Sequence, residues 1–249
     1  MRKLLLVMAT PLVLLSPLFV SPAGAQTGPV CAFDPEAPPA PATIVGAGVI
    51  IGTNGPDVIV GSDGPDTILG LGGDDIICGE GGNDRIDGGD GDDILVGDSI
   101  FAGPPFGPGG DDLLIGGPGA DVLLGLGGND TILGLDGDDT LIGFGGNDRL
   151  LAGPGNDVVF GGPGNDYISG DDGDDLLFGN FGSDTIFGGA GNDEIDGDNP
   201  FLGGPPPGSP PNSASIDLCF GGAGIDEVFN CEAGDASTPR TPPPGGPLG

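Results

Sequence analysis

Aspartate recurs at a nine-residue spacing over most of the chain, and this row of carboxylates is its most chemically promising feature. Sixteen nine-residue units can be aligned, and the sixth position is aspartate in all of them. The chain holds 38 Asp and Glu but only 5 Lys and Arg, and its net charge is -33. Such a row can offer hard oxygen ligands to a cation. The sixth-position residues are Asp57, Asp66, Asp75, Asp84, Asp93, Asp112, Asp121, Asp130, Asp139, Asp148, Asp157, Asp166, Asp175, Asp184, Asp193 and Asp226.

Catalysis is the competing use of these acids. The sequence contains no histidine, so a Ser-His-Asp or Cys-His arrangement is excluded. Paired carboxylates such as Asp74-Asp75 and Asp174-Asp175 have the chemistry for acid–base work. Each pair, however, occupies positions 5 and 6 of a unit, so cation binding accounts for them. We therefore predict that the protein is not an enzyme.

The remaining positions of the unit predict a turn followed by a short strand. Position 4 is always glycine, and position 1 is glycine in fifteen of the sixteen units, with Ala152 as the exception. Glycine permits positive φ and close backbone approach, so positions 1–6 are expected to form a tight turn. Positions 7–9 are expected to form a three-residue strand whose position-8 side chain faces the core. The predicted core ladder is Ile59, Ile68, Ile77, Ile86, Leu95, Leu114, Leu123, Ile132, Leu141, Leu150, Val159, Ile168, Leu177, Ile186, Ile195 and Val228.

A repeat this short predicts a solenoid in which two units form one coil with two facing strands. Coils stacked ~4.8 Å apart bring like carboxylates close together. Each repulsion then costs from about one to several kcal/mol, so a cation is needed between successive turns. Carboxylate and carbonyl oxygens suit Ca²⁺, whereas Mg²⁺ demands stricter octahedral geometry. The chain has no histidine and no thiolate cluster for zinc or copper.

The pattern Gly-Gly-x-Gly-x-Asp-x-U-x, with U aliphatic, resembles the RTX (repeats-in-toxin) calcium-binding nonapeptide family of secreted bacterial β-roll proteins. The resemblance covers Gly52 to Phe229 apart from two insertions. It implies an all-β fold, a right-handed parallel β-roll (a β-solenoid). It also implies multiple Ca²⁺ ions, held by the sixteen aspartates from Asp57 to Asp226 and by loop carbonyls of turns two repeats apart.

The start of the chain has the pattern of a signal peptide. Arg2 and Lys3 precede an apolar stretch, and Ala23-Gly24-Ala25 is a small-residue cleavage site. The apolar stretch is short for a membrane anchor, so we expect cleavage and a secreted, extracellular chain without a membrane span. The negative charge argues against nucleic acid as a partner. The predicted segments are 1–25 signal peptide, 26–42 Pro/Ala-rich lead-in, 43–231 β-roll with insertions at 97–106 and 197–211, and 232–249 disordered Pro-rich tail.

The two insertions resemble each other. One begins Gly97-Asp98 and the other Gly197-Asp198, and each continues to a Phe, a Gly and a Pro pair. Before the first clear unit, residues 43–51 read as a single worn repeat, as expected of a solenoid cap.

Four cysteines in an exported chain indicate two disulfides, for which three connectivities are possible. We favour Cys31–Cys78 and Cys219–Cys231, which place one crosslink at each end of the repeats. Free thiols are the alternative.

Alternate units belong to opposite sheets, so the outward positions 7 and 9 can be sorted by sheet. One outer face is more apolar than the other, and such a face is either a contact site or is covered by the insertions and terminal segments. We therefore predict a structural or adhesive extracellular module, with a possible protein or cell-envelope partner on this face. The alternative is a calcium-dependent extracellular hydrolase or carbohydrate-modifying enzyme. The apolar outward residues include Val60, Cys78, Val96, Leu124, Ile142, Phe160 and Phe178.

Overall fold

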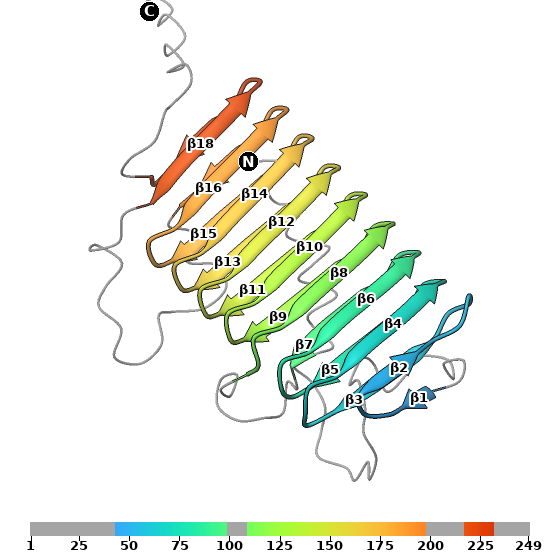
Figure 1. Cartoon of the computed structure of the whole chain (residues 1–249). Helices are drawn as coiled ribbons and strands as arrows, with labels where there is room; N and C mark the ends of the chain where they lie inside the picture. The colour runs from blue at the N-terminus through green and yellow to red at the C-terminus, as the bar shows by residue number, and fades with distance from the viewer. Residues whose placement is uncertain (1–42, 99–108, 198–216, 232–249) are drawn as a thin grey trace, which may run out of the picture.

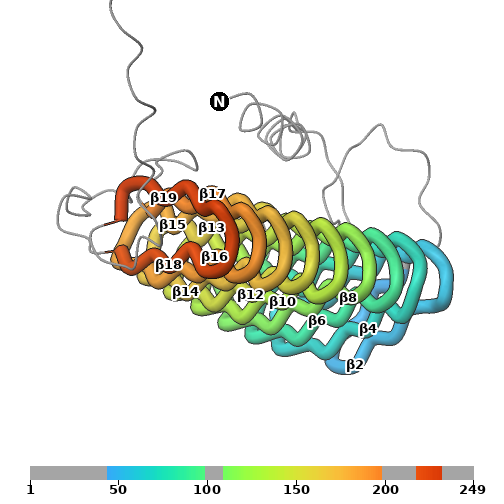
Figure 2. The backbone as a smooth tube through the Cα atoms, turned by 90° about the horizontal axis from the view of Figure 1, so that it is seen from above, coloured from blue at the N-terminus to red at the C-terminus, as the bar shows by residue number. Residues whose placement is uncertain are grey.

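The protein is a stack of coils, each made of two short strands joined by tight turns (Figures 1 and 2). The computed structural model describes residues 43–98, 109–197 and 217–231. These ranges contain strands and turns but no helix, and hence no helix suited to crossing a membrane. The predicted signal peptide, lead-in and tail (1–25, 26–42 and 232–249) lie outside the described residues.

The strands form two parallel sheets, and the two sheets face each other. The chain alternates between them, so odd-numbered strands build one sheet and even-numbered strands the other. The ten-stranded sheet contains β1 (Thr43–Val45), β3 (Val58–Ser62), β5 (Ile76–Glu80), β7 (Ile94–Asp98), β9 (Val122–Gly127), β11 (Thr140–Gly145), β13 (Val158–Pro163), β15 (Leu176–Phe181), β17 (Glu194–Asp196) and β19 (Glu227–Phe229). The nine-stranded sheet contains β2 (Val49–Ile51), β4 (Thr67–Gly72), β6 (Arg85–Asp90), β8 (Leu113–Pro118), β10 (Thr131–Asp136), β12 (Arg149–Pro154), β14 (Tyr167–Asp172), β16 (Thr185–Ala190) and β18 (Leu218–Ala223).

The register places the same repeat position of every second unit side by side. In β10 and β12, for example, Ile132 pairs with Leu150. Register also survives both insertions: Ile86 pairs with Leu114 across the first, and Ile186 pairs with Cys219 across the second. The predicted parallel β-solenoid, with two units per coil, is therefore confirmed.

The core is the predicted position-8 ladder. Every predicted member from Ile59 to Ile195 is fully buried, and Val228 is partly buried against the same cluster. Ile50 and Cys219 extend the ladder at its two ends, and Ala152 joins it from position 1. Burial of one aliphatic side chain per unit thus forms a continuous apolar column along the roll.

The strands are longer than the three residues predicted from positions 7–9. Most run for five or six residues because the pairing continues into positions 1–3 of the next turn. Leu135, for example, pairs with Gly117, and Asp136 with Pro118. The first worn repeat also differs, since residues 43–51 form two strands, β1 and β2, rather than one.

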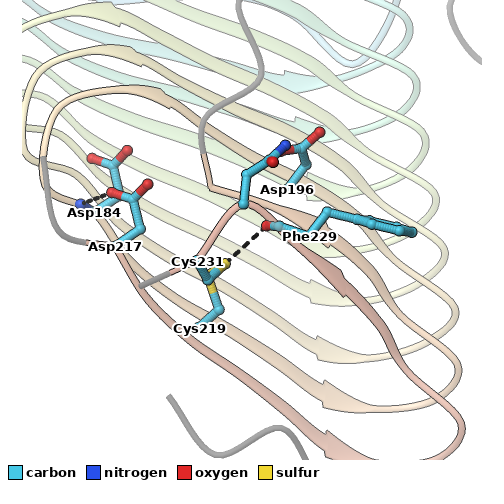
Figure 3. The surroundings of a disulfide bond; sticks show 7 residues. Asp184, Asp196, Asp217, Cys219, Phe229 and Cys231 are labelled. Atoms are coloured by element: carbon cyan, nitrogen blue, oxygen red, sulfur yellow. Dashed lines mark hydrogen bonds between the residues drawn. A yellow bond between two sulfur atoms is a disulfide. The ribbon is translucent and has the colours of Figure 1, made fainter. Parts of the chain in front are cut away.

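The second crosslink closes the C-terminal end of the roll (Figure 3). Cys219 and Cys231 form the predicted disulfide, with their Cα atoms 6.0 Å apart. Cys78 is also disulfide-bonded, while its predicted partner, Cys31, lies outside the described residues. The described part of the chain contains no free cysteine.

The two outer faces differ in burial as well as in composition. Position-9 side chains of the ten-stranded sheet form a second buried cluster, whereas those of the nine-stranded sheet stay partly exposed. At position 2 the contrast is larger: Leu126 in β9 is 3% exposed, but Leu135 in β10 is 45% exposed. The outer apolar side chains of the ten-stranded sheet are therefore buried, whereas their counterparts on the nine-stranded sheet are not. The insertions and terminal segments that could cover this face lie outside the described residues.

Candidate metal centre

The position-6 aspartates form two hydrogen-bonded ladders. One ladder precedes the strands of the ten-stranded sheet and the other precedes those of the nine-stranded sheet. The backbone N–H of each aspartate donates to Oδ1 of the aspartate in the next turn of its ladder, at 2.7–3.3 Å. Figure 3 shows the link from Asp184 to Asp217, which spans the second insertion. The structure thus brings all sixteen predicted aspartates into two rows.

One member of these rows, Asp217, was not among the predicted site residues. It follows the second insertion in a worn unit that retains little else of the pattern. Its Oδ1 accepts the Asp184 N–H at 2.8 Å, and the side chain is fully buried. The signal that could have found it is the nine-residue distance from Asp217 to Asp226.

The second carboxylate oxygen, Oδ2, is where the ladders lack a partner. Position-6 aspartates from Asp57 to Asp193 are at most 4% exposed, and Asp226 is half-buried. A buried carboxylate oxygen without a donor is costly, so this arrangement suits a group that brings positive charge. Oδ2 has no hydrogen-bond partner in Asp75, Asp84, Asp93, Asp112, Asp121, Asp130, Asp139, Asp148, Asp157, Asp166, Asp175, Asp193 and Asp226.

Backbone carbonyl oxygens approach the same space. A Cβ placed on Gly143, at position 1, would lie 2.4 Å from Asp148 Oδ2 and 2.7 Å from the Gly161 carbonyl oxygen. A Cβ on Gly146, at position 4, would lie 1.4 Å from the Gly128 carbonyl oxygen and 3.2 Å from Asp148 Oδ1. The absence of a side chain at these glycines leaves room for the oxygens to approach, and carboxylate and carbonyl oxygens together are the donor set that Ca²⁺ takes.

Positive φ occurs at positions 2 and 4 rather than at the predicted positions 1 and 4. Gly146 has φ 152° at position 4, and Phe144 has φ 68° at position 2. The position-1 glycines have no such φ, and their small size is required by the close approach of Asp Oδ2 and a carbonyl oxygen.

The first two turns satisfy their own carboxylates. Oδ2 of Asp57 accepts the N–H and the hydroxyl of Thr53, at 2.6 and 2.9 Å. Oδ2 of Asp66 accepts the same pair of groups from Ser62, at 2.7 and 3.0 Å. These two predicted site residues therefore cap the N-terminal end of the ladders with protein donors.

Position 5 carries a separate ladder that explains its preference for Asn and Asp. The Oδ1 of Asn129 accepts the backbone N–H of Asn147, and the Oδ1 of Asn147 accepts that of Asn165, each at 2.9 Å. Asp74 accepts the N–H of Asp92 in the same way. The side chain at position 5 thus ties successive turns together on the exposed side of the aspartate rows.

Burial raises the pKa of twelve position-6 carboxyls, those of Asp75, Asp84, Asp93, Asp112, Asp121, Asp130, Asp139, Asp148, Asp157, Asp166, Asp175 and Asp193. It is the largest cause throughout, and hydrogen bonds from backbone N–H groups oppose it. The pKa rises to about 6 for Asp148, about 8 for Asp112 and Asp157, and about 9 for Asp166, where the charge of Asp184 adds to burial. Without a cation, several of these groups therefore hold a proton at neutral pH.

We expect protonation of the buried carboxyls at low pH to stabilise the fold in the absence of a cation. A raised pKa means that the folded chain binds protons more tightly than the unfolded chain, so the metal-free fold gains stability as pH falls. The gain starts as pH drops through about 9, the value for Asp166, and is complete below the ordinary pKa of 3.8. Far-UV circular dichroism in chelator, from pH 9 to pH 4, should show β-structure increasing toward acid. The same titration in high salt screens the exposed carboxylates and should leave the transition in place. A spectrum independent of pH would contradict the raised pKa values.

No group of three or more Asp, Glu or Cys side chains lies close enough to hold a metal ion in the described ranges. Any site on these ladders must therefore combine carboxylates of stacked turns with backbone carbonyl oxygens. The donor set present, carboxylate and carbonyl oxygens, fits Ca²⁺.

Comparison with known proteins points to the same chemistry. A family model described as the RTX calcium-binding nonapeptide repeat matches residues 51–86, 79–99, 106–141, 142–177 and 169–199. A search of curated proteins finds no match to the chain. The matched segments cover more than half of the sequence, and the chain belongs to the RTX calcium-binding nonapeptide repeat family.

Proposed function

We propose that the protein is a secreted structural module that folds when several Ca²⁺ ions bind between its stacked turns. The observation that carries this proposal is the pair of buried aspartate rows in which the Oδ2 atoms of thirteen members, from Asp75 onward, lack donors. The ligands would be the sixteen predicted aspartates together with Asp217, assisted by carbonyl oxygens of positions 1 and 4. Bound Ca²⁺ supplies the positive charge that the described residues do not place in these rows.

Arg85 and Arg149, the cations of the described ranges, are engaged elsewhere. Arg85 pairs with Asp87 at 3.4 Å, and the guanidinium of Arg149 lies 4.5 Å from the ring centre of Tyr167. Both arginines extend from the outer side of the nine-stranded sheet. Repulsion within the aspartate rows is therefore left to a bound ion.

Secretion is proposed from the sequence of residues 1–25 and is supported by the Cys219–Cys231 disulfide. Disulfides persist mainly in oxidising, extracellular environments. Because the unfolded chain has no preformed site, the free energy of calcium binding becomes free energy of folding. The chain would then stay unfolded until it reaches a compartment rich in calcium.

A structural role is favoured over a catalytic or adhesive one. The acidic pairs that a hydrolase could use are engaged in the turns: Oδ1 of Asp74 accepts the N–H of Asp92, and Oδ1 of Asp75 accepts that of Asp57. The apolar outer face is already buried, which favours internal packing over an external protein or cell-envelope partner.

A calcium titration of the mature chain tests the proposal. Far-UV circular dichroism at pH 7.5 should change from a disordered spectrum in chelator to a β-rich spectrum at millimolar Ca²⁺. Mg²⁺ at the same concentration should produce much less structure, because the turns offer flexible oxygen ligands rather than a strict octahedron. A spectrum that does not respond to Ca²⁺ would rule out calcium-dependent folding.

A further inference from the structure

Two turns at the N-terminal end of the roll differ in sequence from the turns that follow. They read Thr53-Asn54-Gly55-Pro56-Asp57 and Ser62-Asp63-Gly64-Pro65-Asp66, with a hydroxyl side chain at position 2 and proline at position 5. The other clear units have neither serine nor threonine at position 2, and none has proline at position 5. Proline has no N–H, so these turns cannot donate to the ladder of position-5 side chains. We call them the hydroxyl turns.

The backbone of the hydroxyl turns also differs from that of the regular turns. Leu71 and Glu80, at position 2 of the next two turns, have φ 86° and 84°. Neither Thr53 nor Ser62 has a positive φ. A β-branched residue such as threonine is strongly disfavoured at positive φ. The residue at position 2 therefore selects the conformation of the turn and the direction of its own N–H.

The hydroxyl turns supply donors to their own aspartates. Oδ2 of Asp57 accepts the N–H and the hydroxyl of Thr53, and Oδ2 of Asp66 accepts the same two groups of Ser62, all within 3.0 Å. Oδ1 of Asp66 accepts in addition the N–H of Gly48 from the worn first repeat. These buried carboxylates thus have protein donors where the Oδ2 atoms of later turns have none.

The carboxylate in a hydroxyl turn also lies farther from position 1. A Cβ on Gly52 would lie 3.0 Å from Asp57 Oδ2, whereas a Cβ on Gly79 would lie 2.2 Å from Asp84 Oδ2 in a regular turn. At position 4, a Cβ on Gly55 would meet nothing within 4 Å, so the carbonyl oxygen that approaches this position in later turns is not placed there. The oxygen atoms that a hard cation requires are therefore fewer in this turn.

We propose that the hydroxyl turns form without an ion, because the N–H and hydroxyl at position 2 supply the donors that Ca²⁺ replaces in the other turns, and that the roll therefore begins to fold at its N-terminal end. The inference rests on the proposed function and removes Asp57 and Asp66 from its ligand set. Folding of a solenoid propagates from coil to neighbouring coil. A first coil that needs no ion thus gives the next coils a sheet edge on which to assemble as Ca²⁺ rises.

Hydrogen exchange of the oxidised mature chain, measured against Ca²⁺ concentration, tests the order of folding. Peptides from residues 49–70 should become protected at about tenfold lower Ca²⁺ than peptides from residues 130–170. The reverse order, or one common midpoint for all peptides, would overturn the proposal while leaving calcium-dependent folding intact. Protection that responds to Ca²⁺ nowhere in the chain would instead refute the proposed function itself.

The variant Thr53→Val with Ser62→Ala removes both hydroxyls with little change in size. Each carboxylate then keeps the N–H of position 2 but loses its second donor, so the 49–70 peptides should need about tenfold more Ca²⁺ for protection. The matched control, Thr67→Val with Thr185→Val, removes two hydroxyls from partly exposed position-7 side chains of the nine-stranded sheet and should leave the midpoint unchanged. Equal midpoints in the two double variants would overturn the proposal.

Thr53→Ser separates the hydroxyl from the shape of the threonine side chain. Serine keeps the donor and loses the branch, so T53S should protect the 49–70 peptides at the wild-type Ca²⁺ concentration. A midpoint shifted as far as in T53V/S62A would show that the branched side chain sets the turn, and the proposal would fail. If T53V/S62A does not fold at saturating Ca²⁺, the order of protection in the wild type and the midpoint of T53S still decide the outcome.

Discussion

Replacing Gly146 by alanine is expected to break the calcium-loaded roll, at a cost of more than about 3 kcal/mol in free energy of unfolding. Gly146 has φ 152°, a conformation that L side chains rarely adopt. The added Cβ would also lie 1.4 Å from the carbonyl oxygen of Gly128 in the turn below. Neither conflict can be relieved by a side-chain movement, because both involve backbone atoms.

The loss of structure in G146A should be confined to the coils next to the substitution. In a solenoid each coil contacts only its neighbours. Loss of the contact between two coils therefore leaves the coils on either side folded instead of destabilising the whole core. Hydrogen exchange of the G146A variant in saturating Ca²⁺ should lose protection around residues 128–164 and retain it in coils far from the substitution. Uniform loss along the whole chain would contradict this nearest-neighbour description.

Gly55 offers a control at the same repeat position. It belongs to the first clear unit, where a Cβ would meet nothing within 4 Å, and its φ is not positive. The same Gly→Ala change there should be neutral or slightly stabilising, since alanine restricts the unfolded chain. Equal melting temperatures for G55A and G146A would show that stacking of turns is not what requires glycine at position 4.

Repetition is what made most of this fold predictable. The residue at position 8 does the same thing in every unit, so Ile132 and Leu150 could be assigned to the core without knowing the structure. The same holds for the sixth-position aspartates, whose spacing alone placed them in rows. A repeated environment averages over local irregularities, and this is why a nine-residue pattern predicts register as well as secondary structure.

The features missed are those that differ between units. Leu126 and Leu135 occupy the same repeat position, yet one is buried in the outer cluster of the ten-stranded sheet and the other is exposed on the nine-stranded sheet. Thr53 carries a hydroxyl that caps Asp57, a role that a consensus of sixteen units hides. Asp98 falls where the pattern stops, so periodicity does not predict its burial.

The sequence predicted that glycine forms the tight turns, but it assigned positive φ to positions 1 and 4 instead of positions 2 and 4. Composition and spacing indicated tight turns, whereas the structure puts positive φ at position 2, where Leu71, Leu126 and Asn180 are tolerated. Position 1 has a small residue for a different reason, the proximity of the Oδ2 of the position-6 aspartate in the same turn. The distances between stacked turns decide which positions require glycine, and these distances cannot be read from the sequence of a single turn.

Asp166→Asn is expected to shift folding in opposite directions with and without calcium. The pKa of Asp166 is raised to about 9, by burial and by the charge of Asp184. Its Oδ1 accepts the N–H of Asp148 at 2.8 Å, an acceptor that asparagine preserves. Its Oδ2 has no hydrogen-bond partner. A Cβ on Gly161 would lie 2.5 Å from this Oδ2 and 2.8 Å from the Gly179 carbonyl oxygen, so both oxygens face the same glycine. An amide at this position removes a buried charge and adds a donor.

In chelator at pH 7.5, D166N should therefore be more structured than the wild type, because its fold no longer has to take up a proton at this buried position. In Ca²⁺ it should require about tenfold more ion to fold, because one charged ligand is lost. Asp138→Asn is the matched comparison: Asp138 is exposed at position 5, and its Oδ1 accepts the N–H of Asn156, which asparagine also allows. That variant removes the same charge and should leave both the structure in chelator and the Ca²⁺ concentration needed for folding nearly unchanged. If D166N and D138N behave alike in both media, the aspartate rows act only through total charge. If D166N alone is more structured in chelator and needs more Ca²⁺ to fold, the buried carboxylates couple folding to the ion. The same carboxylate that disfavours the metal-free fold is then the one that calcium needs.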